Sequence, residues 1–143
     1  MITTGAPAAP DLREEEPVRL LVYSDDVTTR ADVMLAVGRR AAADLPRITW
    51  TEAATHAAVV AAAESGRFAA LVLDGEAAKV GGLGICRQLK SEIFECPPVI
   101  VLIARAQDAW LAAWSEADAV LAAPLDPIEV QRTVARVIRE RRP

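Results

Sequence analysis

Five short apolar runs alternate with segments of helical periodicity from residue 18 onward, and this alternation is the strongest constraint on the fold. The apolar runs are residues 18–23, 47–51, 69–74, 99–103 and 119–122. The segments predicted to be helical are 27–43, 54–65, 82–91, 107–116 and 127–141. Continuous β-branched strands separated by helices predict a parallel sheet with helices on both faces. We therefore expect a doubly wound α/β fold, a three-layer sandwich.

The helical periodicity also predicts which side chains face the core. The residues expected to point inward are Ala31, Leu35 and Val37 in the first helix, Leu83, Cys86 and Leu89 in the third, and Val130, Val134, Val137 and Ile138 in the fifth. These positions recur at the spacing of one helix face. Cys86 is accordingly predicted to be a small core residue.

Length and composition narrow the class of protein. A chain of 143 residues is long enough for one domain. Its net charge of −4 gives no general attraction to nucleic acid or to an anionic membrane. No apolar stretch approaches the roughly 20 residues of a membrane-spanning helix, and the N-terminus does not have the pattern of a secretory signal. The two cysteines do not make a disulfide framework, so we expect a cytoplasmic protein with reduced thiols.

Residues 1–17 differ in composition from the rest of the chain. They contain three prolines and the acidic run Glu14 to Glu16, and they have no apolar period. Such a segment buries too little apolar surface to offset the entropy lost on ordering. We predict a disordered tail over 1–17, with partner binding by the tail as the alternative, and a folded domain over 18–143.

Acidic residues follow two of the predicted strands. Asp74 ends the run 69–74, and Asp25 follows the run 18–23. Open α/β sheets place their chemistry at the carboxyl ends of their strands. The later strands end differently, because Ile103 ends one and Ala123 follows another.

This arrangement resembles the receiver domain of two-component response regulators over about residues 18–141. The segments that carry the resemblance are 19–25 (RLLVYSD) followed by Arg30, 70–74 (ALVLD), 81–90 (GGLGICRQLK), 98–105 (PVIVLIAR) and 117–124 (ADAVLAAP). The resemblance implies a flavodoxin-like sheet with strand order 2-1-3-4-5. It also implies a chemistry in which an aspartate accepts a phosphoryl group beside a divalent cation, whose charge helps to neutralise the phosphoryl oxygens.

Residue by residue, the resemblance places Asp74 at the phosphoacceptor and Asp25 at the second acid of the metal-binding pair. Ser24 stands where the first acid belongs, and Asp26 would replace that acid only if the strand slipped by one residue. Ile103 stands at the switch hydroxyl and cannot donate a hydrogen bond, and Ala123 stands at the lysine and carries no charge. We therefore expect a pseudo-receiver without enzymatic activity. Asp25 and Asp74 are expected to bind Mg²⁺ weakly or not at all and to act as solvated or capping carboxylates.

A partner-binding surface is predicted on segments 107–116, 119–122 and 127–141. Trp110 and Trp114 are four residues apart and share one helix face, with at least one of them expected in the core. Arg132, Arg136 and Arg139 make the last helix basic on its outer face. An exposed tryptophan is a good anchor for a protein contact. A homodimer through this surface is an alternative to a different protein partner, whereas nucleic-acid binding is not expected.

The sequence thus favours a stand-alone atypical receiver, because the chain ends at the last helix with no room for an output domain. The leading interpretation is a protein-binding module that acts independently of phosphorylation, as an adaptor or accessory subunit. Two alternatives remain open. One is a receiver still phosphorylated on Asp74, with Mg²⁺ as cofactor. The other is a small-ligand sensor that uses the less polar pocket beside Ile103 and Ala123.

Overall fold

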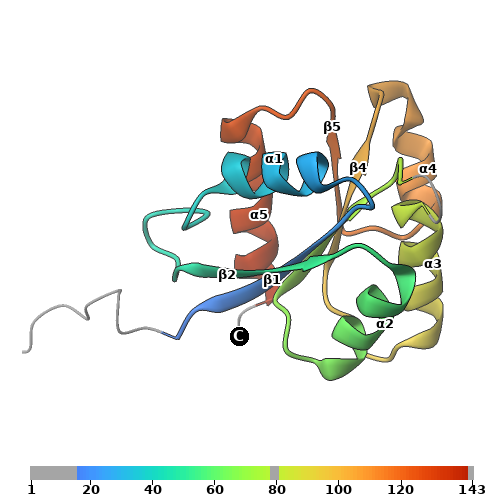
Figure 1. The fold of residues 1–143 in the computed structure, drawn as a ribbon, viewed down its shortest axis with the longest axis horizontal. Coiled ribbons are helices and arrows are strands. Elements are labelled where there is room, and N and C mark those ends of the chain that lie inside the picture. Colours follow the sequence, from blue (N-terminus) through green and yellow to red (C-terminus); the bar gives the residue numbers. More distant parts are fainter. Residues whose placement is uncertain (1–15, 78–80, 142–143) are drawn as a thin grey trace, which may run out of the picture.

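A computed structural model describes residues 16–77 and 81–141. The predicted tail over 1–17 therefore lies outside the described residues, except for its last two. The elements, in chain order, are β1 (Val18–Tyr23), α1 (Val27–Val37), β2 (Ile48–Ala53), α2 (His56–Ser65), β3 (Ala70–Asp74), α3 (Gly82–Glu92), β4 (Val99–Ile103), the 3₁₀ turn η2 (Ala106–Asp108), α4 (Ala109–Trp114), β5 (Ala119–Ala122) and α5 (Pro127–Arg141). Figure 1 shows this alternation of strands and helices.

The five strands form one parallel sheet in the order β2-β1-β3-β4-β5. The predicted doubly wound α/β fold and its strand order are therefore confirmed. Every residue of β3 and β4 is buried. These two strands are apolar except for Asp74, because helices cover both faces of the sheet at its centre.

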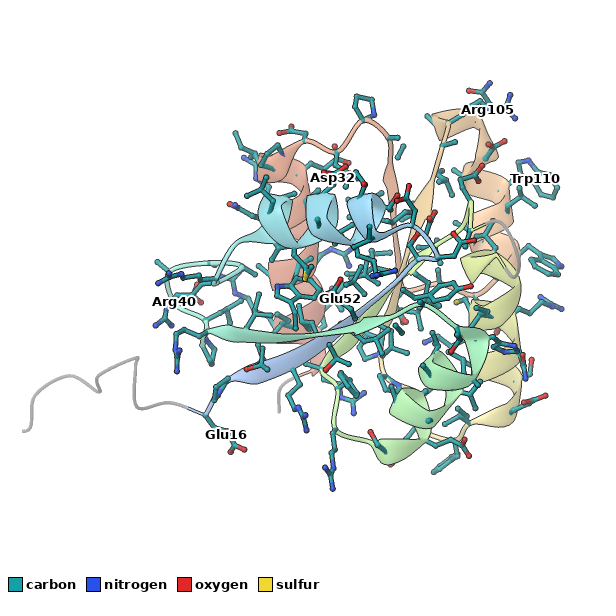
Figure 2. The ribbon with its side chains drawn as sticks, viewed as in Figure 1. Glu16, Asp32, Arg40, Glu52, Arg105 and Trp110 are labelled. Atoms are coloured by element: carbon teal, nitrogen blue, oxygen red, sulfur yellow. The ribbon has the colours of Figure 1, made fainter. Side chains whose placement is uncertain are left out.

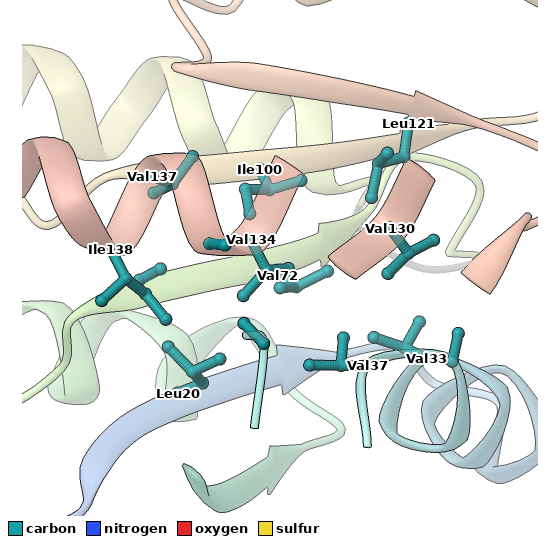
Figure 3. Packing of buried hydrophobic residues seen from close by; sticks show 14 of the residues in the cluster. Leu20, Val33, Val37, Val72, Ile100, Leu121, Val130, Val134, Val137 and Ile138 are labelled. Carbon is teal, nitrogen blue, oxygen red and sulfur yellow. The ribbon is translucent and has the colours of Figure 1, made fainter. Parts of the chain in front are cut away.

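Two separate cores lie on the two faces of the sheet, and successive residues of β1, β3 and β4 contribute to opposite cores. The first core joins α1 and α5 to the sheet (Figure 3). Its members include Leu20, Val22, Val33, Val37, Val72, Ile100, Leu121, Val130, Val134, Val137 and Ile138. The second core joins α2, α3 and α4 to the opposite face and includes Leu21, Tyr23, Val59, Leu71, Ile85, Cys86, Leu89, Val101 and Ala112. The predicted inward positions of α5 and the core position of Cys86 are confirmed.

The first helix differs from its prediction in length and in orientation. It ends at Val37 rather than at residue 43, because Gly38 adopts a positive φ of 79° that ends the helix. Its buried face consists of Val33, Ala36 and Val37. The predicted inward positions of Ala31 and Leu35 are wrong, and Leu35 is 83% exposed.

The second strand and the fourth helix also depart from their predicted bounds, whereas α2, α3 and β3 differ by only one or two residues. The second strand covers Ile48–Ala53 instead of 47–51, because its residues pair with β1 along its whole length, from Val18 to Tyr23. The predicted helix over 107–116 is a 3₁₀ turn followed by the short helix α4. Among the described residues, no helix has the length and apolar character needed to cross a membrane.

Candidate functional site

The sheet brings Ser24 and Asp74 side by side. In the parallel pair of strands β1 and β3, Tyr23 lies opposite Leu73. The residues that follow them, Ser24 and Asp74, therefore also lie next to each other. Ser24 is completely buried, and its Oγ donates a hydrogen bond of 2.8 Å to Oδ2 of Asp74. The residue at the position of the missing first acid is thus a hydrogen-bond donor to the candidate acceptor.

The Asp74 carboxylate is held at both of its oxygens. While Oδ2 accepts from Ser24, Oδ1 accepts a hydrogen bond of 2.9 Å from the backbone N–H of Glu76. The residue is only 8% exposed. Both donors are neutral, so hydrogen bonds stabilise this carboxylate without supplying a counter-charge.

Asp26 caps a helix and does not take the place of the missing acid. Its Oδ1 accepts from the backbone N–H of Thr28 at 2.9 Å, which makes Asp26 the N-cap of α1. Its own N–H donates to Oγ of Ser24 at 3.0 Å. Arg30 donates from Nη1 to the Ser24 carbonyl at 2.6 Å, a contact that fits the strand register without a slip. Asp25 is exposed at the mouth of the site.

The close packing of the backbone around Asp74 requires two glycines. Gly82 belongs to the segment 81–90 that carried the resemblance, whereas Gly75 was not singled out in the sequence. A Cβ at Gly75 would lie 2.5 Å from the Leu102 carbonyl oxygen, to which the Gly75 N–H donates at 2.9 Å. A Cβ at Gly82 would lie 2.8 Å from the Asp74 carbonyl oxygen. Gly75 could have been identified from the sequence, because it directly follows Asp74 at the end of a buried strand.

Ile103 and Ala123 lie next to each other at the same edge of the sheet. The Ala123 N–H donates to the Ile103 carbonyl at 2.9 Å, and both residues line a cleft that also contains Asp74. Their side chains provide neither a hydroxyl nor an ammonium group. The structure therefore brings the two substituted positions together with the candidate acceptor.

This cleft has a volume of about 890 Å³ and lies between α1, the end of β4 and the connection from β5 to α5. Its acidic lining consists of Asp25, Asp26, Asp32, Asp74 and Glu76. Figure 2 shows Asp32 on α1 at this end of the molecule. The apolar lining consists of Leu35, Ala36, Leu102, Ile103, Ala104, Ala123, Pro124, Leu125 and Pro127. No lysine, arginine or histidine is among the described residues that line the cleft.

The donor set does not fit a Mg²⁺ site of the kind that the resemblance implies. Within residues 16–77 and 81–141, no three or more His, Cys, Asp or Glu side chains are arranged to hold a metal ion. Asp25 and Asp74 are the two predicted ligands, and Asp25 is exposed at the mouth of the site. Because Ser24 stands in place of the first acid, only two of the three carboxylates that the resemblance implies around the cation are present.

The pKa values of two titratable side chains, Tyr23 on β1 and Cys86 on α3, are raised. Burial raises the pKa of the Tyr23 phenol, and the carboxylates of Asp25 and Asp74 raise it further. Burial also raises the pKa of the Cys86 thiol to about 11. The Cys86 Sγ donates to the Ser115 carbonyl at 3.3 Å, in keeping with its neutral form. Neither group is a reactive nucleophile at neutral pH.

The two tryptophans of α4 lie on the surface. Trp110 is 67% exposed and Trp114 is 47% exposed, so the prediction that at least one is a core residue is wrong. Figure 2 shows Trp110 pointing away from the body of the protein. The residue of α4 that enters the core is Ala112. With only six residues, the helix buries a narrow face and leaves the two larger side chains outside.

The arginine that contacts a tryptophan comes from α3 and was not singled out in the sequence. The Arg87 guanidinium lies 4.7 Å from the Trp114 ring centroid, and its Nη1 donates to the Trp114 carbonyl at 2.5 Å. Arg132, Arg136 and Arg139 are exposed on α5. Arg136 pairs with Glu140 at 3.2 Å, and Arg139 pairs with Asp44 in the connection from α1 to β2.

Comparisons with known proteins agree with the fold. No protein-family model matches the chain. Two uncharacterized response regulatory proteins of Mycobacterium tuberculosis match it, Rv3143 of strain ATCC 25618 / H37Rv and MT3230 of strain CDC 1551 / Oshkosh. Each is 48% identical over 122 residues, which cover 85% of this chain and 92% of the relative.

Solved structures show the same fold. The receiver domain of the Francisella response regulator 1452 superposes with a TM-score of 0.72 at 17% identity, over 87% of this chain and 99% of that one. The chemotaxis response regulator CheY4 of Vibrio cholerae gives a TM-score of 0.68 at 18% identity, over 85% of this chain and 99% of that one. With the relatives at 48% identity, these likenesses establish that the chain belongs to the response regulator receiver family.

Proposed function

We propose that this receiver is a protein-binding module that acts independently of phosphorylation, as an adaptor or an accessory subunit of a larger assembly. The observation that carries the proposal is the exposure of both Trp110 and Trp114 on one short helix. Tryptophan is enriched among the residues that dominate binding energy at protein interfaces. On this proposal the chain is not an enzyme, and its partner-binding face includes α4, β5 and α5.

The contacts of Trp114 support its role as an anchor. Arg87 lies over the indole ring and also bonds the backbone of the same residue, which restricts the orientation of the ring. A side chain that is already held loses less entropy when a partner covers it. Val120 of β5 is 37% exposed and extends the apolar surface from α4 to the edge of the sheet.

The arginines of α5 would contribute in a different way. Arg132, Arg136 and Arg139 are exposed, and two of them take part in surface ion pairs. Charges at the rim of an interface mainly change the association rate and its salt dependence. We therefore assign the affinity to the tryptophans and the electrostatic steering toward an acidic partner surface to these arginines.

Independence from phosphorylation is supported by the surroundings of Asp74. Transfer of a phosphoryl group requires positive charge around its oxygens. The described lining of the cleft contains five carboxylates and no basic side chain, and Ile103 and Ala123 lack the polar groups of a receiver switch. A phosphoryl group on Asp74 would therefore meet repulsion rather than stabilisation.

The test uses the tagged protein as bait in the cells that produce it. Proteins retained by the wild type are identified by mass spectrometry and then tested with purified Trp110→Ala and Trp114→Ala variants. We expect each substitution to weaken binding of the partner about thirtyfold, or ~2 kcal/mol. Phe94→Ala is the matched control, because Phe94 is another exposed aromatic residue, located between α3 and β4. Normal binding by both tryptophan variants, with loss of binding in Asp74→Asn, would overturn the proposal.

Phosphotransfer to Asp74 is the second candidate, because this carboxylate ends β3 within an open cleft. The experiment is incubation with acetyl phosphate and Mg²⁺, followed by intact-mass measurement. We expect no added phosphate, for the electrostatic reason given above. A mass increase of one phosphate that is absent in Asp74→Asn would instead establish the second candidate.

A further inference from the structure

The cleft at the carboxyl edge of the sheet has the size of a small-molecule site. Its volume of about 890 Å³ falls within the roughly 300–1,000 Å³ of typical ligand pockets. Its walls come from α1, from the end of β4 and from the connection between β5 and α5. The exposed tryptophans are not among the residues that line it. Any ligand of this cleft would therefore be distinct from the protein partner proposed above.

One wall of the cleft is apolar, including at its rim. Ile103, Ala123 and Pro124 form part of the lining. Leu35 also lines the cleft and is 83% exposed, which leaves a large apolar side chain in water at the entrance. A ligand with an apolar body would bury this surface, and removing apolar surface from water favours binding.

The acidic part of the lining contains a buried carboxylate, Asp74, without a counter-charge among the described residues. Asp74 is 8% exposed, and its two oxygens accept hydrogen bonds from the Ser24 hydroxyl and the Glu76 N–H. No ion pair joins Asp74 to a cation in the described part of the chain. A buried carboxylate is costly unless a positive charge offsets its desolvation. Its oxygens retain lone pairs, since an ionised carboxylate has about four acceptor sites.

We propose that this cleft binds a protonated organic amine with an apolar body. The ammonium group would donate to the Asp74 carboxylate, with Asp32 and Glu76 adding negative potential, and the apolar body would lie against Ile103 and Leu35. This chemistry fits better than a bare divalent cation, because the described acids do not form a metal-ligand group of three or more and nine of the fifteen lining residues are apolar. A phosphate or a carboxylic acid would be repelled by the acidic wall.

The experiment measures binding of 4-phenylbutylamine to the ¹⁵N-labelled full chain by NMR titration at neutral pH. For a ligand of this size, we expect a saturable Kd of about 1 mM. The shifted amides should be those of residues around the cleft. The neutral analogue 4-phenylbutanol is expected to bind at least ~10-fold more weakly, because it cannot compensate the buried charge.

Substitutions in the lining test which residues bind the ammonium group of the ligand and which contact its apolar body. Asp74→Asn keeps the shape of the side chain and removes its charge, so it should weaken amine binding at least ~10-fold. Leu35→Ser should weaken it about fivefold through lost apolar contact. Glu64→Gln is the matched control, because it removes one carboxylate from the exposed surface of α2, outside the cleft. The NMR spectrum of each variant also reports whether the protein remains folded.

Three results would overturn the proposal. The first is the absence of saturable shifts at up to roughly 20 mM amine, far above the expected Kd. The second is equal affinity for the amine and the alcohol, or unchanged affinity in Asp74→Asn. The third is Mg²⁺ binding at the same residues that displaces the amine at lower concentration, which would make the cleft a metal site.

Discussion

Ser24 changes the chemistry of the site more than any other single residue. A carboxylate at this position would face Asp74 at close range, and two adjacent carboxylates disfavour each other's ionisation. The serine hydroxyl instead donates to Asp74 at 2.8 Å. The site therefore keeps Asp25 and Asp74 but has a neutral hydrogen-bond donor to Asp74 where the resemblance implies a third acid. The sequence predicted the loss of the acid, but it could not predict this hydrogen bond, because the bond depends on the register of β1 and β3.

Gly75 provides a test of backbone packing beside Asp74. Gly75→Ala would place a Cβ 2.5 Å from the Leu102 carbonyl oxygen, so the ends of β3 and β4 must separate. We expect it to lower the free energy of unfolding by at least ~2 kcal/mol, measured by urea denaturation. Gly84→Ala is the control, since no atom lies within 4 Å of a Cβ there. In α3 this second substitution should raise stability by about 0.5–1 kcal/mol. Equal effects of the two substitutions would contradict the close approach of the Leu102 carbonyl to Gly75.

Cys86 makes stability depend on pH in the alkaline range. Its folded-state pKa is raised from 9.0 to about 11 by burial, so the unfolded thiol ionises first as the pH increases. The stabilising contribution is therefore complete below pH 9 and is lost as the pH rises through 11. A shift of this size corresponds to about 2–3 kcal/mol.

Urea denaturation at several pH values between roughly 8 and 11 checks this dependence. We expect the wild type to lose about 2 kcal/mol more across this range than Cys86→Ser. The serine hydroxyl does not ionise here, and it can still donate to the Ser115 carbonyl. Tyr23 titrates in the same direction in both proteins, so its effect cancels in the comparison. An identical decline in both proteins would show that Cys86 does not carry the effect.

At the scale of single elements, helix α1 shows where sequence periodicity fails. The segment is rich in Ala, Val and Leu, so more than one helix face satisfies the apolar spacing. Packing against α5 and the sheet selects Val33, Ala36 and Val37, and Leu35 is left exposed. The opposite case is β4, whose uninterrupted run of five buried apolar residues made its predicted bounds, 99–103, correct.

The start of α1 depends on the Asp26 cap. Asp26→Ala removes the acceptor for the Thr28 N–H, so we expect a loss of about 1 kcal/mol in the free energy of unfolding. Asp32→Ala is the control, because it removes the same charge from the exposed middle of the same helix. This control should leave stability unchanged or slightly raised, since alanine has the higher helix propensity. Thermal or urea denaturation distinguishes the two, and a smaller loss in Asp26→Ala than in Asp32→Ala would exclude the capping role.

At the scale of the whole molecule, the layered fold was predictable because its signal is repeated along the chain. Strand order was predictable only through the family resemblance, since alternation alone does not say which strands are neighbours. The cleft was predictable only in outline. The sequence indicated Asp25 and Asp74 at the ends of two strands. It did not indicate that Asp32 and Leu35 also line the cleft, because this depends on the orientation of α1.

The arrangement of the sheet predicts a gradient of local stability. Strand β3 lies between β1 and β4 and is buried along its whole length, whereas β2 and β5 are the edge strands. We expect amide hydrogen exchange to be slowest in β3 and faster in β2 and β5, because edge strands open at lower free energy. Exchange measured by NMR or mass spectrometry checks this order. Slower exchange in β5 than in β3 would show that the centre of the sheet is not the most stable unit.

The exposure of the α4 indoles has an optical consequence. The chain has three tryptophans, of which Trp110 is 67% exposed, Trp114 is 47% exposed and Trp50 is partly buried on β2. Two of the three fluorescent indoles therefore lie on the surface that we assign to the partner. A protein that covers α4 would move this emission to shorter wavelength, while an amine in the cleft would leave it nearly unchanged. Tryptophan fluorescence can therefore distinguish binding of a protein partner at α4 from binding of an amine in the cleft, without any added label.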